Sequence, residues 1–149
     1  FWRGSMMAEP DQPPRSGVHH SRVRVRYAET DQQGIAYHAH YLIWMEVGRT
    51  EFLDALGFPY RRLEEQGLVF SVVEARCRYM QPARYHDVVE IATRVSELRS
   101  RSVVFAYELN AGGLGLAVGE TRLLAMGTNR RPRRIPDDLT LALRRVASG

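Results

Sequence analysis

The chain has 149 residues, of which 44% are apolar and 26% charged, which is typical of one ordinary globular domain. No apolar run approaches the roughly 18 residues that a membrane span needs, and no apolar leader opens the chain, so neither membrane insertion nor secretion is expected. The net charge is +4, and all 21 basic residues are arginines. The planar guanidinium suits a phosphate-bearing ligand, although a GC-rich genome would produce the same bias.

A single cysteine, Cys77, excludes an internal disulfide and favours a reducing compartment, so we expect a cytoplasmic protein. Cys77 lies in an alternating segment, and we interpret it as a small buried strand residue rather than a nucleophile. Phe1 to Ser5 look like a cloning remnant ahead of Met6, and the stretch up to Ser21 is rich in Pro, Asp and Gly. We therefore predict that residues 1–21 are disordered and that residues 22–149 form a single domain.

Alternating apolar and charged residues predict a first strand over residues 22–27, followed by a loop over residues 28–36. Residues 41–56 contain no proline and a single glycine, Gly48, which predicts a helix. Gly57 and Pro59 follow, so the helix is expected to end at residue 56. Its apolar residues cover more than one stripe, so we expect the helix to be buried on several sides.

Four further strand patterns follow, over residues 69–79, 88–98, 103–109 and 116–129, with a hairpin turn at residues 110–113. Short connections between successive strands predict antiparallel neighbours. Residues 136–146 are expected to form a short C-terminal helix. The sequence therefore predicts an α+β fold in which a curved antiparallel sheet wraps around one long central helix.

The residues best suited to chemistry lie between Tyr27 and Tyr41. Asp31 lies on a loop with Gly34, shortly before the predicted buried helix. The first N–H groups of a helix lack intrahelical partners and can stabilise an oxyanion, so Asp31 would face a polarised carbonyl there. A carboxylate in that place can attack a thioester or deprotonate a water molecule, and the sequence does not choose between the two.

This segment resembles the hot-dog-fold acyl-CoA thioesterases of the 4-hydroxybenzoyl-CoA thioesterase type, including the branch associated with Tol-Pal gene clusters. The matching positions are Thr30-Asp31, Gly34, Tyr37-His38, Tyr41, Glu46 and Gly48-Arg49-Thr50-Glu51, and weaker agreement extends to Pro136. The resemblance implies a hot-dog fold and hydrolysis of an acyl-CoA thioester to a free acid and coenzyme A. It implies no cofactor beyond the coenzyme A of the substrate.

In that family the residue at the Asp31 position is the essential carboxylate, and the residue at the His38 position gives a backbone N–H to the substrate carbonyl. Gly34 has an equally good explanation as a turn residue with positive φ. We expect the acyl group to lie in an apolar pocket beside the helix, lined by Tyr37, Tyr41 and Trp44.

The resemblance also implies that basic residues contact the nucleotide end of coenzyme A, here Arg99, Arg101, Arg133 and Arg134. Hot-dog proteins of this kind generally join sheets edge to edge and share active sites between subunits. We therefore expect a homo-oligomer, a dimer or a homotetramer.

Several alternatives stay open or are disfavoured. A non-catalytic acyl-CoA-binding module and a thioesterase acting on acyl carrier protein are the two rival functions. His38, His40 and His86 do not make a metal site without further converging ligands, so no metal is expected. The basic run at residues 130–134 lacks any nucleic-acid-binding motif, so nucleic acid is not expected. Glu46 is interpreted as the partner of Arg49, three residues further along the helix.

Overall fold

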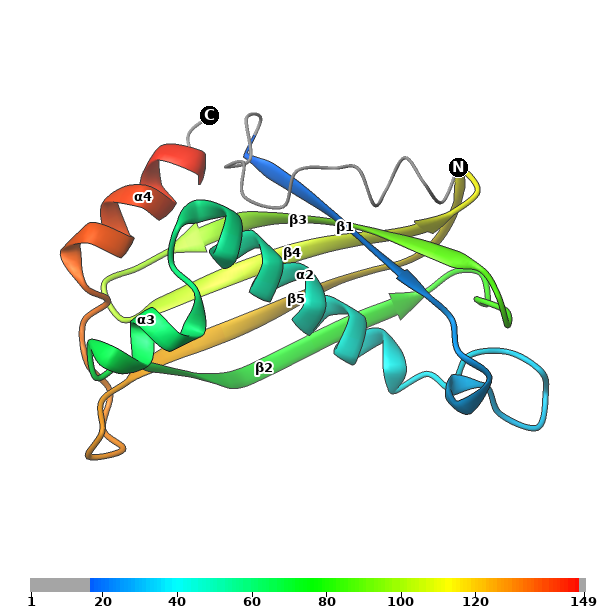
Figure 1. Cartoon of the computed structure of the whole chain (residues 1–149), viewed down its shortest axis with the longest axis horizontal. Coiled ribbons are helices and arrows are strands. Elements are labelled where there is room, and N and C mark those ends of the chain that lie inside the picture. Colours follow the sequence, from blue (N-terminus) through cyan, green and yellow to red (C-terminus); the bar gives the residue numbers. More distant parts are fainter. Residues whose placement is uncertain (1–16, 148–149) are drawn as a thin grey trace.

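The computed structural model describes residues 17–147, which form a five-stranded antiparallel sheet with helices on it (Figure 1). In chain order the elements are β1 (Val18–Arg24), the 3-10 helix η1 (Tyr27–Glu29), α2 (His40–Leu56), α3 (Tyr60–Glu65), β2 (Val69–Tyr79), β3 (Val88–Leu98), β4 (Ser102–Ala111), β5 (Leu114–Met126) and α4 (Asp137–Ala147). The strand order across the sheet is β1-β3-β4-β5-β2. No helix within residues 17–147 is long and apolar enough to cross a bilayer.

The long helix α2 lies across one face of the sheet, which curves around it (Figure 1). Met45 and Phe52 of α2 are fully buried against strand residues such as Ile91 and Phe105. Burial of these large apolar side chains, from both the helix and the sheet, is the main force that holds α2 against the sheet. The expected α+β hot-dog fold is confirmed.

Gly48 allows α2 to approach the sheet closely. A Cβ at this position would collide with the Oγ1 of Thr93 and would come within 2.9 Å of the Cγ2 of Ile91. Gly57 ends the helix in the left-handed region, with φ of 92°, and its N–H donates to the carbonyl of Asp54. A glycine adopts that conformation without strain, which explains why the helix ends where the sequence predicts.

The N-terminal boundary differs from the prediction. Strand β1 begins at Val18, which pairs with Arg94 of β3, so residues 18–21 belong to the sheet and the prediction of disorder was wrong for them. Two histidines and a serine interrupt the alternation there, but the side chain of Ser21 is buried and the ring of His19 packs edge-on against Phe52 of α2. Residues 1–16 lie outside the described residues. The short helix α3 was not predicted.

Candidate active site

The loop that carries Asp31 is closed at its base by backbone hydrogen bonds. Thr30 and Ala36 form a β-bridge, and the N–H of Asp31 donates to the carbonyl of Ile35 at 2.9 Å. Gly34 supplies the turn, with φ of 78°, and its N–H donates to the carbonyl of Asp31 at 3.0 Å. The predicted turn role of Gly34 is therefore confirmed, and the loop has one well-defined course.

The side chain of Asp31 is held in a fixed orientation by this loop. Its Oδ1 accepts a hydrogen bond of 2.8 Å from the N–H of Gln33, and the residue is only partly buried. Within residues 17–147, no protein donor reaches Oδ2. Asp31 thus presents one oriented carboxylate oxygen for chemistry.

Two backbone N–H groups lie at the far end of the same segment, just before α2. The N–H groups of the first helical residues are partly satisfied, because His40 donates to the carbonyl of Tyr37 at 3.0 Å and Tyr41 to that of His38 at 3.4 Å. By contrast, the N–H groups of His38 and Ala39 have no acceptor in the described part of the chain. Adjacent free donors of this kind are suited to bind a carbonyl oxygen or an oxyanion.

Tyr79, the last residue of β2, contacts this segment from the sheet. Its hydroxyl donates a 2.8 Å hydrogen bond to the carbonyl of His38, and its ring packs edge-on against the rings of His38 and Tyr41. Burial and the neighbouring Cys77 raise the pKa of Tyr79 to about 12, so it remains a protonated donor at neutral pH. This contact was not predicted from the sequence, because its two residues lie 41 positions apart.

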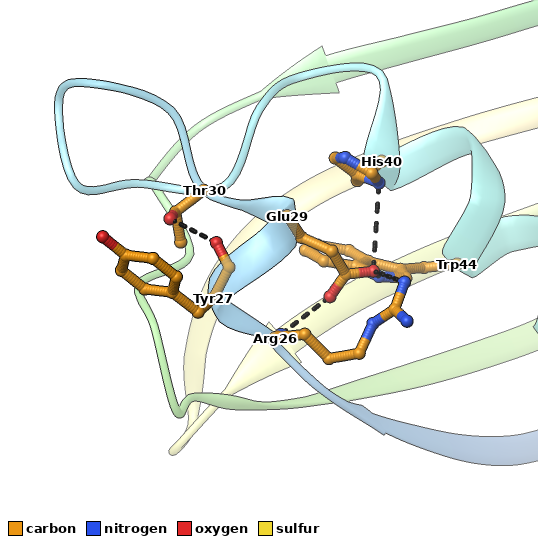
Figure 2. Close-up of polar contacts among 6 residues, drawn as sticks. All are labelled: Arg26, Tyr27, Glu29, Thr30, His40 and Trp44. Atoms are coloured by element: carbon orange, nitrogen blue, oxygen red, sulfur yellow. Dashed lines mark hydrogen bonds and ion pairs between the residues drawn. The ribbon is translucent and has the colours of Figure 1, made fainter.

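A buried carboxylate ties the Asp31 loop to the helix (Figure 2). Glu29 is only 4% exposed, and its side chain accepts hydrogen bonds from the backbone N–H of Arg26 at 2.8 Å and from the indole N–H of Trp44 at 3.3 Å. The Arg26 guanidinium lies 3.5 Å from the same carboxylate, and Nδ1 of His40 lies 3.8 Å from it. Glu29 therefore stabilises the approach of η1 to the first turns of α2.

Sequence reasoning missed Glu29 as a structural residue. The only available signal was a glutamate two positions before Asp31, in a segment otherwise expected to be a solvated loop. The structural role of Glu29 is visible only in the fold, where its carboxylate is buried and accepts a hydrogen bond from the indole of Trp44, fifteen positions away.

The three aromatic residues predicted to line an acyl pocket differ in exposure. The ring of Tyr37 is 47% exposed and lies 4.4 Å, centroid to centroid, from the ring of His38. Tyr41 and Trp44 are both 2% exposed. The hydroxyl of Tyr41 accepts a 3.0 Å hydrogen bond from the N–H of Ala83, and burial raises the pKa of Tyr41. All three follow Asp31 closely in the sequence, and their contact with a substrate stays a prediction.

The predicted arginines lie at the other end of the sheet. We call residues 29–41 together with Tyr79 the loop end, and residues 99–101 together with 133–134 the arginine end. Arg101 directly precedes Ser102 of β4, which pairs with Leu124 of β5. Leu124 also pairs with Ser71 of β2, so Arg101 lies level with the beginning of β2. Ser71 and Tyr79 are eight residues apart on one strand, which at about 3.3 Å per residue separates the two ends by about 26 Å. Figure 1 shows this separation, with the segment before α2 in cyan and the segment before α4 in orange.

The arginine end has structural contacts of its own. Arg133 donates to the carbonyl of Gln66 at 3.0 Å, just after α3, and the Arg99 Nε lies 3.4 Å from Glu97. Arg101 and Arg134 have exposed side chains. Within a single chain these arginines and Asp31 are not brought together.

Other predicted contacts can be placed as well. Glu46 is exposed and lies 3.5 Å from Arg49, which confirms the pair expected on the helix. A cavity of about 650 Å³ lies on the sheet face away from α2, lined by residues that include Arg76, Arg78 and Arg94. It contains no residue of the loop end. Among residues 17–147, no group of three or more His, Cys, Asp or Glu is placed to hold a metal ion.

Comparison with known proteins places these features in context. A family model described as the thioesterase-like superfamily matches residues 25–143. The acyl-CoA thioesterase YbgC of Haemophilus influenzae is 33% identical over 122 residues, covering 80% of this chain and 90% of the relative. A DHNA-CoA thioesterase structure from Staphylococcus aureus is 29% identical, with a TM-score of 0.84 over 88% of this chain and 91% of that chain. The hypothetical protein TT1821 from Thermus thermophilus is 42% identical, with a TM-score of 0.82 over 85% of this chain and 98% of that chain.

Proposed function

Because this chain belongs to the thioesterase-like superfamily, we propose that it is an acyl-CoA thioesterase whose hydrolysis depends on Asp31. One observation carries the proposal: a single short segment holds an oriented carboxylate and two backbone N–H groups that have no acceptor among residues 17–147. An acyl thioester needs both a nucleophile or base and donors for its carbonyl oxygen. Two similar proteins are named as an acyl-CoA thioesterase and a DHNA-CoA thioesterase, which supports coenzyme A as the carrier of the acyl group.

Two routes are open to Asp31. As a nucleophile, its carboxylate oxygen forms a bond to the thioester carbon, the carbonyl electron pair moves to oxygen, and the C–S bond breaks to release the coenzyme A thiolate. Water then hydrolyses the mixed anhydride. As a general base, Asp31 takes a proton from the water whose oxygen attacks the same carbon. In both routes the N–H groups of His38 and Ala39 stabilise the oxyanion, and the products are a free acid and coenzyme A.

The first test is thiol release from short-chain, long-chain and aromatic acyl-CoAs by the wild type, Asp31→Asn and Asp87→Asn. Asp87 is a matched control, because its carboxylate also accepts a loop N–H, that of Arg84, at 2.8 Å. We expect Asp31→Asn to lower kcat by on the order of a hundredfold or more, as for loss of a catalytic acid or base, and Asp87→Asn to keep it.

Two results would overturn the assignment. Binding of acyl-CoA without hydrolysis by the wild type would favour a binding module. Hydrolysis of acyl carrier protein thioesters in its place, strongly weakened by salt, would favour that carrier. If hydrolysis is found, a single turnover in oxygen-18-labelled water is followed by mass analysis of Asp31. Label in Asp31 would establish the nucleophilic route, with water attacking the Asp31 carbon of the mixed anhydride, because general-base catalysis places the label only in the released acid.

We further propose that a second copy of the chain completes each site. Strand β2 is an edge strand, since it pairs only with β5 among the described strands, and Val69, Val72 and Val73 on it are about half exposed. A long apolar edge is normally covered. Antiparallel pairing of two β2 strands about a two-fold axis would place the arginine end of one copy beside the loop end of the other.

Mixed dimers test this arrangement. One subunit carries Asp31→Asn, and the other carries Arg101→Ala with Arg134→Ala. If the two ends serve one site from different subunits, one site in each mixed dimer is intact and activity returns with wild-type KM. If each chain supplies both groups to its own site, the mixed dimer shows only the raised KM of the arginine variant, and the arrangement is wrong.

A further inference from the structure

We propose that Tyr79 is a positioning residue for the proposed hydrolysis: its hydroxyl fixes the peptide between His38 and Ala39 so that the Ala39 N–H faces the substrate carbonyl. The inference rests on the proposed function and adds a residue from β2 that holds the donors for the oxyanion. Its basis is one hydrogen bond of 2.8 Å between the Tyr79 hydroxyl and the carbonyl of His38.

Planarity of the peptide links this hydrogen bond to the site. The C=O of His38 and the N–H of Ala39 belong to the same peptide unit, and in a trans peptide they point in opposite directions. A donor that fixes the carbonyl on one side therefore fixes the direction of the N–H on the other. The N–H of Ala39 has no acceptor within residues 17–147, so it is available to a ligand.

The same hydrogen bond also strengthens the donor. Hydrogen bonds in a chain polarise one another, so a carbonyl that accepts from a hydroxyl makes the N–H of its own peptide a better donor. The carbonyl of His38 accepts a second, longer bond from the N–H of Tyr41, at 3.4 Å. Tyr79 is thus the closer of the two groups that hold this peptide unit.

The position of Tyr79 on the sheet makes it a rigid support. It ends β2, pairs with Ala117 of β5, and packs edge-on against the buried ring of Tyr41. Preorganised donors matter because they cost no reorganisation when charge develops on the substrate. A loop peptide held only by its neighbours in sequence would be less constrained.

The test compares Tyr79→Phe with Tyr107→Phe. Both variants lose one hydroxyl, and that of Tyr107 is hydrogen-bonded to Thr121 at 2.6 Å inside the core, not to the segment before α2. We expect Tyr79→Phe to lower kcat by roughly tenfold and to change KM by less than about threefold. Removing an oxyanion donor outright lowers kcat by about 10²–10³-fold, and loss of the residue that orients the donor should have a smaller effect. Tyr107→Phe should lower stability and keep kcat.

A spectroscopic comparison in the Asp31→Asn background is independent of turnover. The infrared stretching frequency of a carbon-13-labelled thioester carbonyl is measured in Asp31→Asn and in the double variant with Tyr79→Phe. We expect a higher frequency in the double variant, because the carbonyl is less polarised. An unchanged frequency together with an unchanged kcat would overturn the inference while leaving the thioesterase assignment intact. A wild type that neither binds nor hydrolyses any acyl-CoA would overturn both.

Discussion

The two ends of the sheet hold their polar groups in different ways. At the loop end, Asp31 and the N–H groups of His38 and Ala39 are fixed by backbone hydrogen bonds and by contacts from Glu29 and Tyr79. At the arginine end, the groups are long side chains, of which Arg101 and Arg134 are exposed. The loop end has the fixed geometry that a reaction at a thioester carbonyl needs. The arginine end suits the attraction of a charged group such as a phosphate, because charge attraction does not require a fixed geometry.

This difference bears on the proposal that two copies of the chain share each site. The N–H groups of His38 and Ala39 are positioned by the course of their own segment, whereas the exposed Arg101 and Arg134 reach into solvent, where a neighbouring molecule can meet them. A separation of about 26 Å along the strands is consistent with a division of labour between two copies. Four substitutions or pairs of substitutions test this comparison, from the largest expected effect to the smallest.

Removing the buried carboxylate of the loop end should have the largest effect. Glu29→Ala leaves the buried indole N–H of Trp44 and the backbone N–H of Arg26 without their acceptor. An unsatisfied buried donor costs about 1–3 kcal/mol, so we expect the free energy of unfolding to fall by about 2–4 kcal/mol, with a large loss of kcat. Glu46→Ala, which removes an exposed carboxylate, should cost less than about 1 kcal/mol. Urea denaturation measures both, and equal losses would mean that Glu29 has no special structural role.

The next largest effect should come from lifting the helix away from the sheet. Gly48→Ala forces Thr93 and Ile91 to move, and overpacking of this kind costs about 1–3 kcal/mol. Gly115→Ala is the control, because a Cβ there meets only ordinary contacts at 3.6 Å. A shift of α2 also moves the first turn of the helix, so kcat should fall in Gly48→Ala alone. If Gly48→Ala lowered stability without changing kcat, the geometry of the loop end would not depend on how closely α2 packs against the sheet.

Helix α2 and the residues around its first turn show which features can be predicted from the sequence and which cannot. The helix and its end at Gly57 were predicted because apolar spacing and a glycine at the C-terminus act locally. Asp31 was proposed from the local motif and its resemblance to a family, and its catalytic role stays a prediction. Glu29 and Tyr79 were not identified as site residues, because their roles arise from contacts with Trp44 and His38 that only the tertiary fold creates.

Substitutions at the arginine end should separate binding from stability. Arg101→Ala combined with Arg134→Ala removes two exposed cations, and we expect KM to rise by about tenfold, equivalent to about 1.4 kcal/mol, with kcat and stability unchanged. Arg133→Ala should lower stability by about 1 kcal/mol, because its guanidinium donates to the carbonyl of Gln66. Steady-state kinetics at low and high salt, with thermal unfolding, provides the measurement. A loss of kcat in the double variant would contradict the separation of roles.

The smallest expected effect concerns the half of α2 nearer the arginine end, where His19 packs against Phe52 with Glu51 at 4.0 Å. Burial lowers the pKa of His19 below its ordinary value, with a further lowering from His20, while Glu51 and Asp54 oppose the shift. The unfolded chain therefore binds a proton at this residue at a higher pH than the folded chain does. As a result, the free energy of unfolding should decrease as the pH falls from about 6.5 and should level off below the pKa of the folded state.

His19→Asn removes this titration, whereas His20→Asn, at the exposed neighbouring position, keeps it and loses only the smaller contribution of His20 to the shift. Urea denaturation at a series of pH values between 7.5 and 5 should show a shallower decline for His19→Asn than for the wild type or His20→Asn. Equal slopes in all three proteins would mean that other groups cause the decline. Because His19 lies away from Asp31, kcat measured at pH 7.5 should be the same in all three, which would separate the stability of this half of the helix from the chemistry of the loop end.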